Sequence, residues 1–77
     1  MIMEMYSIRD IKTQLYSQPF FAQNKASAIR QFDYLMSNAQ MIAPDCELYY
    51  LGYFDSSNGN CVVCVPEFIK NAEVVNG

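Results

Sequence analysis

The chain has 77 residues, of which 52% are hydrophobic and 17% are charged. This composition excludes a disordered tail, because disordered segments combine few apolar residues with a high net charge, and the length allows one domain. Eight acidic against five basic residues give a net charge of −3, which argues against a general polyanion binder. Since a domain of this size buries a modest core, we expect a homo-oligomer.

Neither a membrane span nor a secretory signal is predicted from the sequence. The apolar runs fall short of the roughly 18 residues that a span needs. Glu4 interrupts the apolar start, and no basic segment precedes it. We therefore expect a cytoplasmic protein whose three cysteines are reduced.

Two strands are predicted before the first helix. In Met3–Arg9, Tyr6 and Ile8 fall on one face at the period of two that is typical of a strand. After a polar turn, Gln14–Ser17 is predicted to return as a second strand. Pro19 limits or ends its ladder, because proline has no N–H to donate.

A helix is predicted over Asn24–Ser37, with Asn24 as the N-cap whose side chain accepts from a free amide of the first turn. The apolar residues of this segment recur at helical spacing and define one face that should cover the core. They are Ala28, Ile29, Phe32, Leu35 and Met36.

The second half of the chain predicts a hairpin. In the strand Glu47–Phe54, strict alternation places Leu48, Tyr50 and Gly52 on one face and Tyr49, Leu51 and Tyr53 on the other, so both faces are largely apolar or aromatic. Asp55–Gly59 supplies an Asn-Gly turn. Asn60–Val65 is predicted to pair back as the last strand and to end at Pro66.

Shorter segments flank this hairpin. In the connection that precedes it, Met41 and Ile42 are expected to pack under the domain. After Pro66, Glu67–Asn71 is expected to form one helical turn, and residues 72–77 to be loosely ordered.

The predicted fold is thus α+β, in the order β-β-α-β-β, within a single domain spanning residues 1–77. One amphipathic helix covers one face of an antiparallel sheet. The other face carries several tyrosines and is the expected interaction surface.

The composition offers little for catalysis. There is no histidine and no Gly-rich phosphate loop among three glycines, so we expect no enzyme, no cofactor and no metal site. Cys61 and Cys64 have the spacing of a redox or zinc half-site. On a strand, residues three apart point to opposite faces, which favours a role as small apolar residues.

Aromatic and basic residues suggest a binding role instead. Tyrosines on a sheet with nearby cations are typical of single-stranded nucleic-acid platforms, because every base offers a face for stacking. The alternative is that these tyrosines pack under the helix or against a second subunit. The candidate nucleic-acid-binding residues are Tyr6, Tyr16, Tyr49, Tyr53, Arg9, Lys12, Lys25 and Arg30.

A series of short motifs resembles the small nonstructural proteins of gokushovirus-type phages, which are single-stranded DNA phages of the Microviridae. The resemblance spans about residues 6–68, and its specificity lies in the order of the motifs. They are Tyr6–Lys12 (YSIRDIK), Pro19-Phe20-Phe21, Gln23-Asn24, Ala28-Ile29-Arg30, Phe32, Asp45–Tyr49 (DCELY), Leu51-Gly52, Phe54-Asp55 and Gly59.

This resemblance implies a non-virion protein made in the cytoplasm of the infected host. Members of that family are commonly described as DNA-binding, which implies single-stranded phage DNA, or the replication complex on it, as the ligand. The resemblance supplies no site residues. The alternative that it leaves open is a homo-oligomeric protein-interaction module, which contacts the replication or procapsid proteins without touching DNA.

Overall fold

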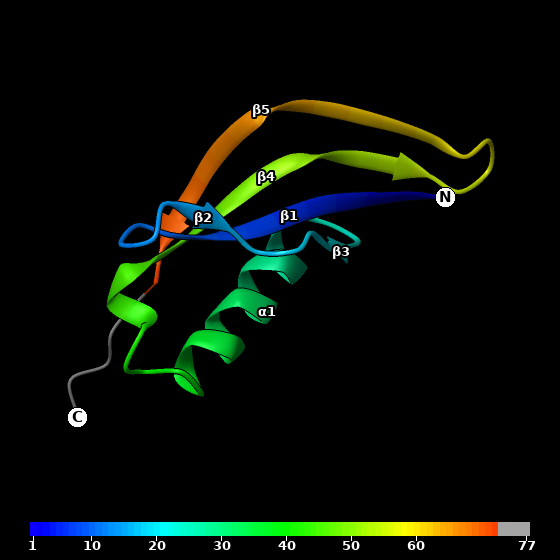
Figure 1. Cartoon of the computed structure of the whole chain (residues 1–77). Helices are drawn as coiled ribbons and strands as arrows, with labels where there is room; N and C mark the ends of the chain where they lie inside the picture. Colours follow the sequence, from blue (N-terminus) through cyan, green and yellow to red (C-terminus); the bar gives the residue numbers. More distant parts are fainter. Residues whose placement is uncertain (73–77) are drawn as a thin grey trace.

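The computed structural model describes residues 1–72 and combines an antiparallel sheet with one α-helix (Figure 1). The α+β class is confirmed, but the predicted order is not, because three strands rather than two precede the helix. The elements are β1 (Ile2–Asp10), β2 (Leu15–Tyr16), β3 (Phe20–Ala22), α1 (Lys25–Ser37), a 3-10 helix η1 (Ala43–Asp45), β4 (Cys46–Asp55) and β5 (Asn60–Asn71).

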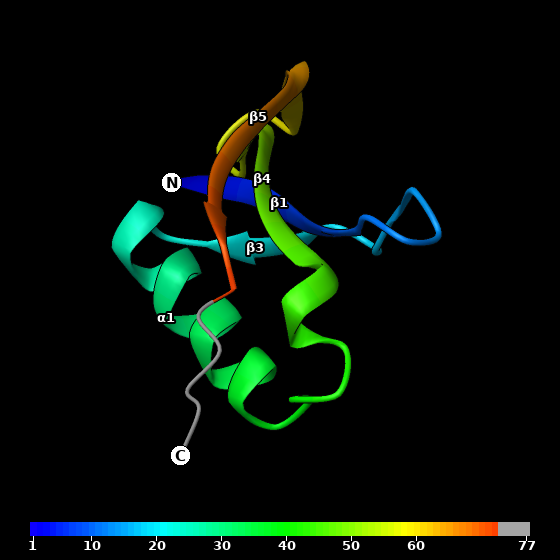
Figure 2. The same cartoon turned by 90° about the vertical axis from the view of Figure 1, so that its left-hand side faces the viewer.

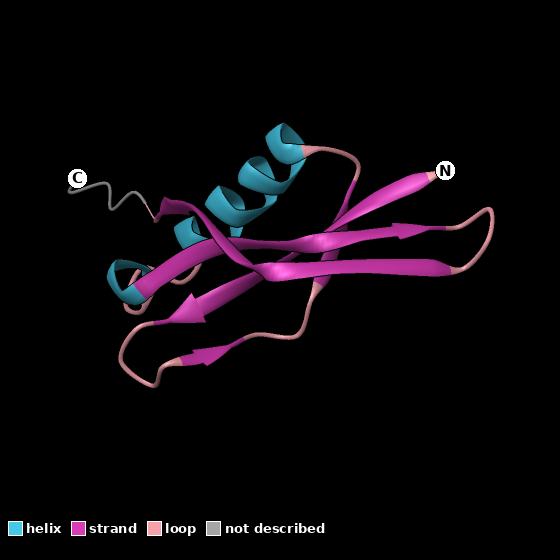
Figure 3. Cartoon of the chain, turned by 90° about the horizontal axis from the view of Figure 1, so that it is seen from above, coloured by secondary structure: helices cyan, strands magenta, loops and turns pink. Residues whose placement is uncertain are grey.

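Strand β1 lies inside the sheet. On one side it pairs with β4 along its length, and on the other side with β2 and β3, so the order is β2-β1-β4-β5 with β3 also beside β1 (Figure 3). The predicted second strand, Gln14–Ser17, is observed as the shorter β2, and the chain pairs with β1 again as β3 after Pro19, which cannot donate to the ladder. Between β2 and β3, the side-chain hydroxyl of Ser17 bonds to β1 by accepting from the amide of Ile8 at 3.0 Å.

Helix α1 begins where the sequence predicted. The side chain of Asn24 accepts from the amide of Ser27 at 2.8 Å, which caps the first turn. The helix packs on the β1 and β3 side of the sheet (Figures 1 and 2). Its apolar face is narrower than predicted, since Ala28, Phe32 and Met36 are buried whereas Leu35 is exposed.

The core lies between α1 and one sheet face. Tyr6 and Leu48 supply its large sheet side chains, and Phe32 supplies the helix side chain that meets them. The predicted packing of Met41 is wrong: its side chain is 96% exposed, and Ala43 is buried in its place. The 3-10 turn with Pro44 in its first turn directs Ala43 inward and leaves the longer side chains before it outside.

The last strand continues past Pro66, contrary to the prediction that it would end there. Residues 67–71, expected as a helical turn, pair with β4, with Glu67 opposite Tyr50 and Asn71 opposite Glu47. Proline is tolerated because β5 is an edge strand and its register with β4 shifts at this point. The amide of Ala72 donates to Cys46 at 3.2 Å. The rest of the predicted loose tail, residues 73–77, lies outside the described part of the chain.

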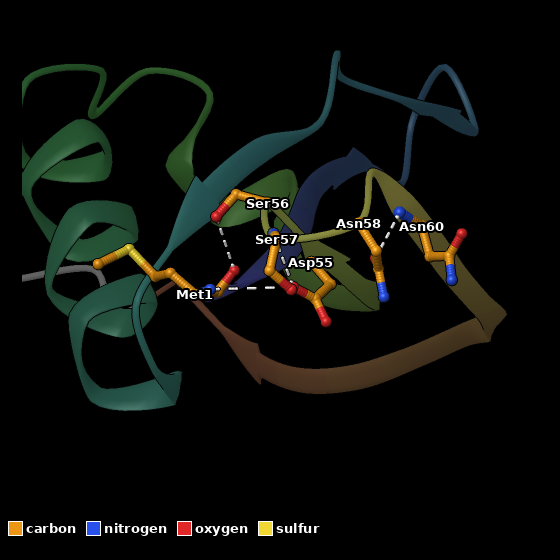
Figure 4. A network of polar contacts seen from close by, with 6 residues as sticks. All are labelled: Met1, Asp55, Ser56, Ser57, Asn58 and Asn60. Atoms are coloured by element: carbon orange, nitrogen blue, oxygen red, sulfur yellow. Dashed lines mark hydrogen bonds and ion pairs between the residues drawn. The ribbon is translucent and has the colours of Figure 1, made fainter.

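The β4–β5 turn is held by short polar contacts (Figure 4). Both the amide and the hydroxyl of Ser57 donate to Asp55, at 2.9 and 2.6 Å, and these bonds lower the pKa of Asp55. The hydroxyl of Ser56 donates to the carbonyl of Met1 at 3.1 Å. The turn is therefore tied to the start of β1, and the hairpin extends beyond the helix as an ordered ribbon (Figure 1).

Candidate functional site

Three of the predicted site residues share the sheet face that points away from α1. Because Tyr6 belongs to the core, its neighbours in β1 point to the other face, and so does Arg9 three positions on. Tyr16 pairs with Arg9 in register and therefore lies on the same face. Tyr49 reaches Tyr16 across β1, with ring centroids 5.3 Å apart.

Phe68 extends this group to a row of three rings, which we call the aromatic row: Tyr16, Tyr49 and Phe68. Phe68 lies opposite Tyr49 in register, and their ring centroids are 5.8 Å apart. Both contacts are edge-to-face, with interplanar angles of 75° and 76°. Tyr16 is 45% and Phe68 48% exposed, so both end rings offer surface to a ligand.

A small residue lets these rings meet. Ser7 lies opposite Tyr49 in register and is fully buried, and its hydroxyl donates to the carbonyl of Ser17 at 2.8 Å. A larger side chain at this place on β1 would stand between Tyr16 and Tyr49. The row therefore depends on a serine whose own hydrogen bonding is satisfied within the sheet.

One ion pair adjoins the aromatic row. The guanidinium of Arg9 lies 5.9 Å from the ring centre of Tyr16 and 3.4 Å from a carboxylate oxygen of Glu47. The same oxygen accepts from the hydroxyl of Tyr49 at 3.3 Å. Burial, and then the nearby Glu47 carboxylate, raises the pKa of Tyr49, which favours the protonated hydroxyl that donates to Glu47. One cation, Arg9, and one anion, Glu47, therefore lie side by side next to the aromatic row.

Tyr6 was predicted as a stacking residue, but the structure places it in the core. Its side chain is 1% exposed, and its ring packs against Phe20 and Tyr50. Its hydroxyl donates to Glu4 at 2.6 Å. Burial raises the pKa of Tyr6, and the bond to the Glu4 carboxylate raises it further. No base could reach this ring without unfolding the core.

Tyr53 does not join the aromatic row. It lies opposite Glu4 in register, and Glu4 in turn lies opposite Ala22, which belongs to the core. Directly opposed residues share a sheet face, so Tyr53 is on the side of α1. The strict alternation predicted along Glu47–Phe54 is broken because the register with β1 shifts between Met5 and Tyr6.

The predicted cations are dispersed. Lys12 lies in the turn after β1, where its ammonium is 3.6 Å from Asp45. Lys25 and Arg30 belong to α1, on the opposite side of the sheet from the aromatic row. On the same helix, Asp33 accepts from the ammonium of Lys70 at 3.0 Å. Only Arg9 and Lys12 lie on or beside the end of the sheet that bears the row.

Phe68 is the site residue that sequence reasoning missed. It follows Pro66 closely, and proline was expected to end the strand. A signal was present: after Pro66 and Glu67, Phe68 and Ile69 resume the aromatic and β-branched composition that is typical of strands.

The three cysteines lie in different environments. Cys46 is buried, Cys61 and Cys64 are exposed, and all three are free thiols. Cys61 contacts the sulfur of Met5 at 3.8 Å. No three metal-binding side chains cluster among the described residues. The one α-helix described is too short to cross a membrane.

The fold and the exposed row describe a small α+β domain with an open aromatic sheet face. Residues 3–75 match the family of the Phage ORF5 protein, so the chain belongs to that family and is a small phage protein. No curated protein and no solved structure shows significant similarity to it.

Proposed function

We propose that this phage protein is a non-enzymatic single-stranded DNA-binding protein that acts in viral genome synthesis, or in its switch to single-strand production and packaging, in the cytoplasm of the host. The observation that carries the proposal is the aromatic row, with Arg9 beside Tyr16, on the sheet face that points away from α1. The gokushovirus resemblance supports the choice of ligand, since those phages package single-stranded DNA.

Stacking must supply most of the affinity. A base stacked on an aromatic side chain contributes about 1–3 kcal/mol, and Tyr16 and Phe68 expose enough ring surface for this. Phosphate contacts are few, because Arg9 and Lys12 are the cations nearest the row and each faces a carboxylate. For two phosphates on a single strand, the logarithm of affinity should fall with the logarithm of salt at a slope of about −1.4.

The first test removes the rings while keeping apolar volume. Tyr16→Leu combined with Phe68→Leu should weaken binding of a labelled single-stranded oligonucleotide by at least about tenfold at low salt, from the loss of stacking. The matched control is Tyr34→Leu, an exposed tyrosine on α1. Equal affinity of the double variant and the control, measured by fluorescence anisotropy, would remove the row as a DNA platform.

A second test uses the carboxylate of Glu47, which adjoins the aromatic row. Glu47→Gln removes the charge that engages Arg9 at 3.4 Å and frees the guanidinium for a phosphate. Because opposite charges near a surface interact by about 1 kcal/mol or more, we expect oligonucleotide affinity to rise about fivefold at low salt. Unchanged or weaker binding would show that no phosphate approaches Arg9.

The second candidate function is a homo-oligomeric protein-interaction module that contacts replication or procapsid proteins without binding DNA. It is favoured by the net charge of −3 and by the carboxylates that engage Arg9, Lys12 and Lys70. The aromatic row would then be a protein contact, where Tyr and Phe are enriched. Under this function, reversing the charge of Arg9 and Lys12 should leave activity in the infected cell intact, whereas the first proposal expects its loss.

A further inference from the structure

The outer edge of β5 runs beside a long, exposed and largely apolar segment of the described chain. β5 pairs with β4 on one side, and none of the described residues pairs with its other side. Residues 60–68 are all exposed, and Val63 and Val65 reach 72% and 86%. An open strand edge presents unpaired amides and carbonyls that can pair with another chain. Native proteins usually prevent such pairing with charged residues, proline, or a segment that covers the edge.

Such protection is present elsewhere in this sheet. The outer side of β1 is covered by β2 and β3. In β5, Pro66 and the register shift beside it interrupt the edge, and Glu67 and Lys70 add charge beyond them. The first half of the strand, Asn60–Val65 (NCVVCV), has neither charge nor proline. This half of β5 is therefore an edge left open.

We propose that the open edge of β5 pairs antiparallel with β5 of a second copy of this chain, centred on Val63. A second copy fits because antiparallel pairing of identical strands is self-complementary and closes with two-fold symmetry. Copies that carry −3 each repel one another, and the uncharged segment is where this repulsion is weakest. The inference is independent of DNA binding, which a single copy could perform through its own aromatic row.

The register follows from symmetry and side-chain chemistry. When two identical strands pair antiparallel, the two-fold axis perpendicular to the sheet passes midway between two directly opposed residues. One residue must therefore face its own copy. With Val63 at the axis, Cys61 faces Val65 and Val62 faces Cys64, so the five central residues form apolar pairs. Centring on Cys64 would bring Pro66 opposite Val62, and centring on Glu67 would set two carboxylates opposite each other, which is destabilising.

The shape of the molecule allows this approach. The hairpin extends beyond α1, so the first half of β5 is not shielded by the helix (Figures 1 and 3). The polar contacts of the turn hold the strand extended before a partner arrives. Rotation about an axis perpendicular to the sheet keeps both helices on one side, so the two aromatic rows would lie together on the other side.

Blocking the edge is the first test. Val63→Lys with Val65→Lys places charges on highly exposed positions and should leave the far-UV spectrum and the folded monomer intact. The mass of the native protein, measured by light scattering, should approach twice the monomer mass as concentration rises, whereas the variant should stay monomeric. Met41→Lys, an equally exposed apolar position, is the matched control and should dimerise like the native chain.

Crosslinking tests the register. In a Cys61→Ser, Cys64→Ser background, Val63→Cys should form a disulfide dimer under mild oxidation, because facing residues of neighbouring strands bring their Cβ atoms within about 5.5 Å. Met41→Cys in the same background gives the rate of chance collisions. A native chain that stays monomeric up to about 1 mM, or a dimer that forms equally well with lysines at Val63 and Val65, would overturn the proposal. A dimer that depends on those valines but lacks the Val63→Cys crosslink would overturn the register.

Discussion

Tyr6 shows how a single side chain links burial to pH dependence. Its hydroxyl is buried and donates to Glu4, and both effects raise its pKa above the ordinary value of 10.0. A raised pKa means that the folded state holds the proton more tightly than the unfolded state. The stability from this group is therefore fully present below pH 10 and is lost as pH rises above it.

Tyr6→Phe should weaken this dependence. We expect the free energy of unfolding to fall by about 1 kcal/mol at neutral pH, from the lost hydrogen bond, and to decline less steeply than in the native chain above pH 10. Urea unfolding at several alkaline pH values measures both effects. Tyr34→Phe, at an exposed helix position, should follow the native curve. Parallel alkaline curves for Tyr6→Phe and the native chain would contradict the account.

At the scale of elements, Gly52 controls how β4 fits between its neighbours. The register of β4 shifts beside Gly52 against both β1 and β5. Gly52 has a φ of +137°, and a Cβ built there would lie 2.0 Å from the carbonyl oxygen of Val62. Only glycine fits at this point, and the irregularities curl the sheet so that β5 starts away from α1 and ends beside it (Figure 2).

Gly52→Ala should therefore destabilise the fold by about 3 kcal/mol or more, because strain and a backbone clash combine. Gly59→Ala is the matched control: its φ is +76°, but a Cβ there meets nothing within 4 Å. We expect the control to lose about 1 kcal/mol, from the left-handed backbone alone. Equal losses in urea unfolding would mean that β4 can shift to admit the methyl group.

At the scale of the whole molecule, the sheet separates two populations of basic residues. Arg9 lies with the aromatic row, whereas Lys25 and Arg30 lie on the helix that covers the other face. If DNA binds the row, Lys25→Gln with Arg30→Gln should change oligonucleotide affinity by less than about twofold at moderate salt, since exposed charges beyond about 10 Å are screened.

Arg9→Gln is the comparison for that prediction and should weaken binding severalfold while reducing the salt slope by about 0.7. Gel-shift titrations at two salt concentrations measure both quantities. A larger loss from the helix variant than from Arg9→Gln would place the DNA path on the helix side and leave the aromatic row to a protein partner.

The sequence by itself determined the features that depend on neighbours along the chain. The cap at Asn24, the buried positions Ala28, Phe32 and Met36, and the hairpin turn before Asn60 all follow from local spacing and turn chemistry. The placement of Tyr16 and Tyr49 on strands was also predicted. These are short-range effects, set by hydrogen bonds and side-chain periods within a few residues.

Only the tertiary structure decided which side chains share a face and which charges meet. Because the register shifts around Gly52, Tyr53 and Tyr49 lie on opposite faces of the sheet, although strict alternation predicted one shared face. Tyr6 is buried in the core instead of lying on the open face. Pro66 remained in a strand because β5 lies at the edge, which added Phe68 to the row. The ammonium of Lys70 donates to Asp33, which is 37 positions away in the sequence. Such outcomes depend on the pairing of distant strands and on the register shifts within it, which change the face on which the following residues lie.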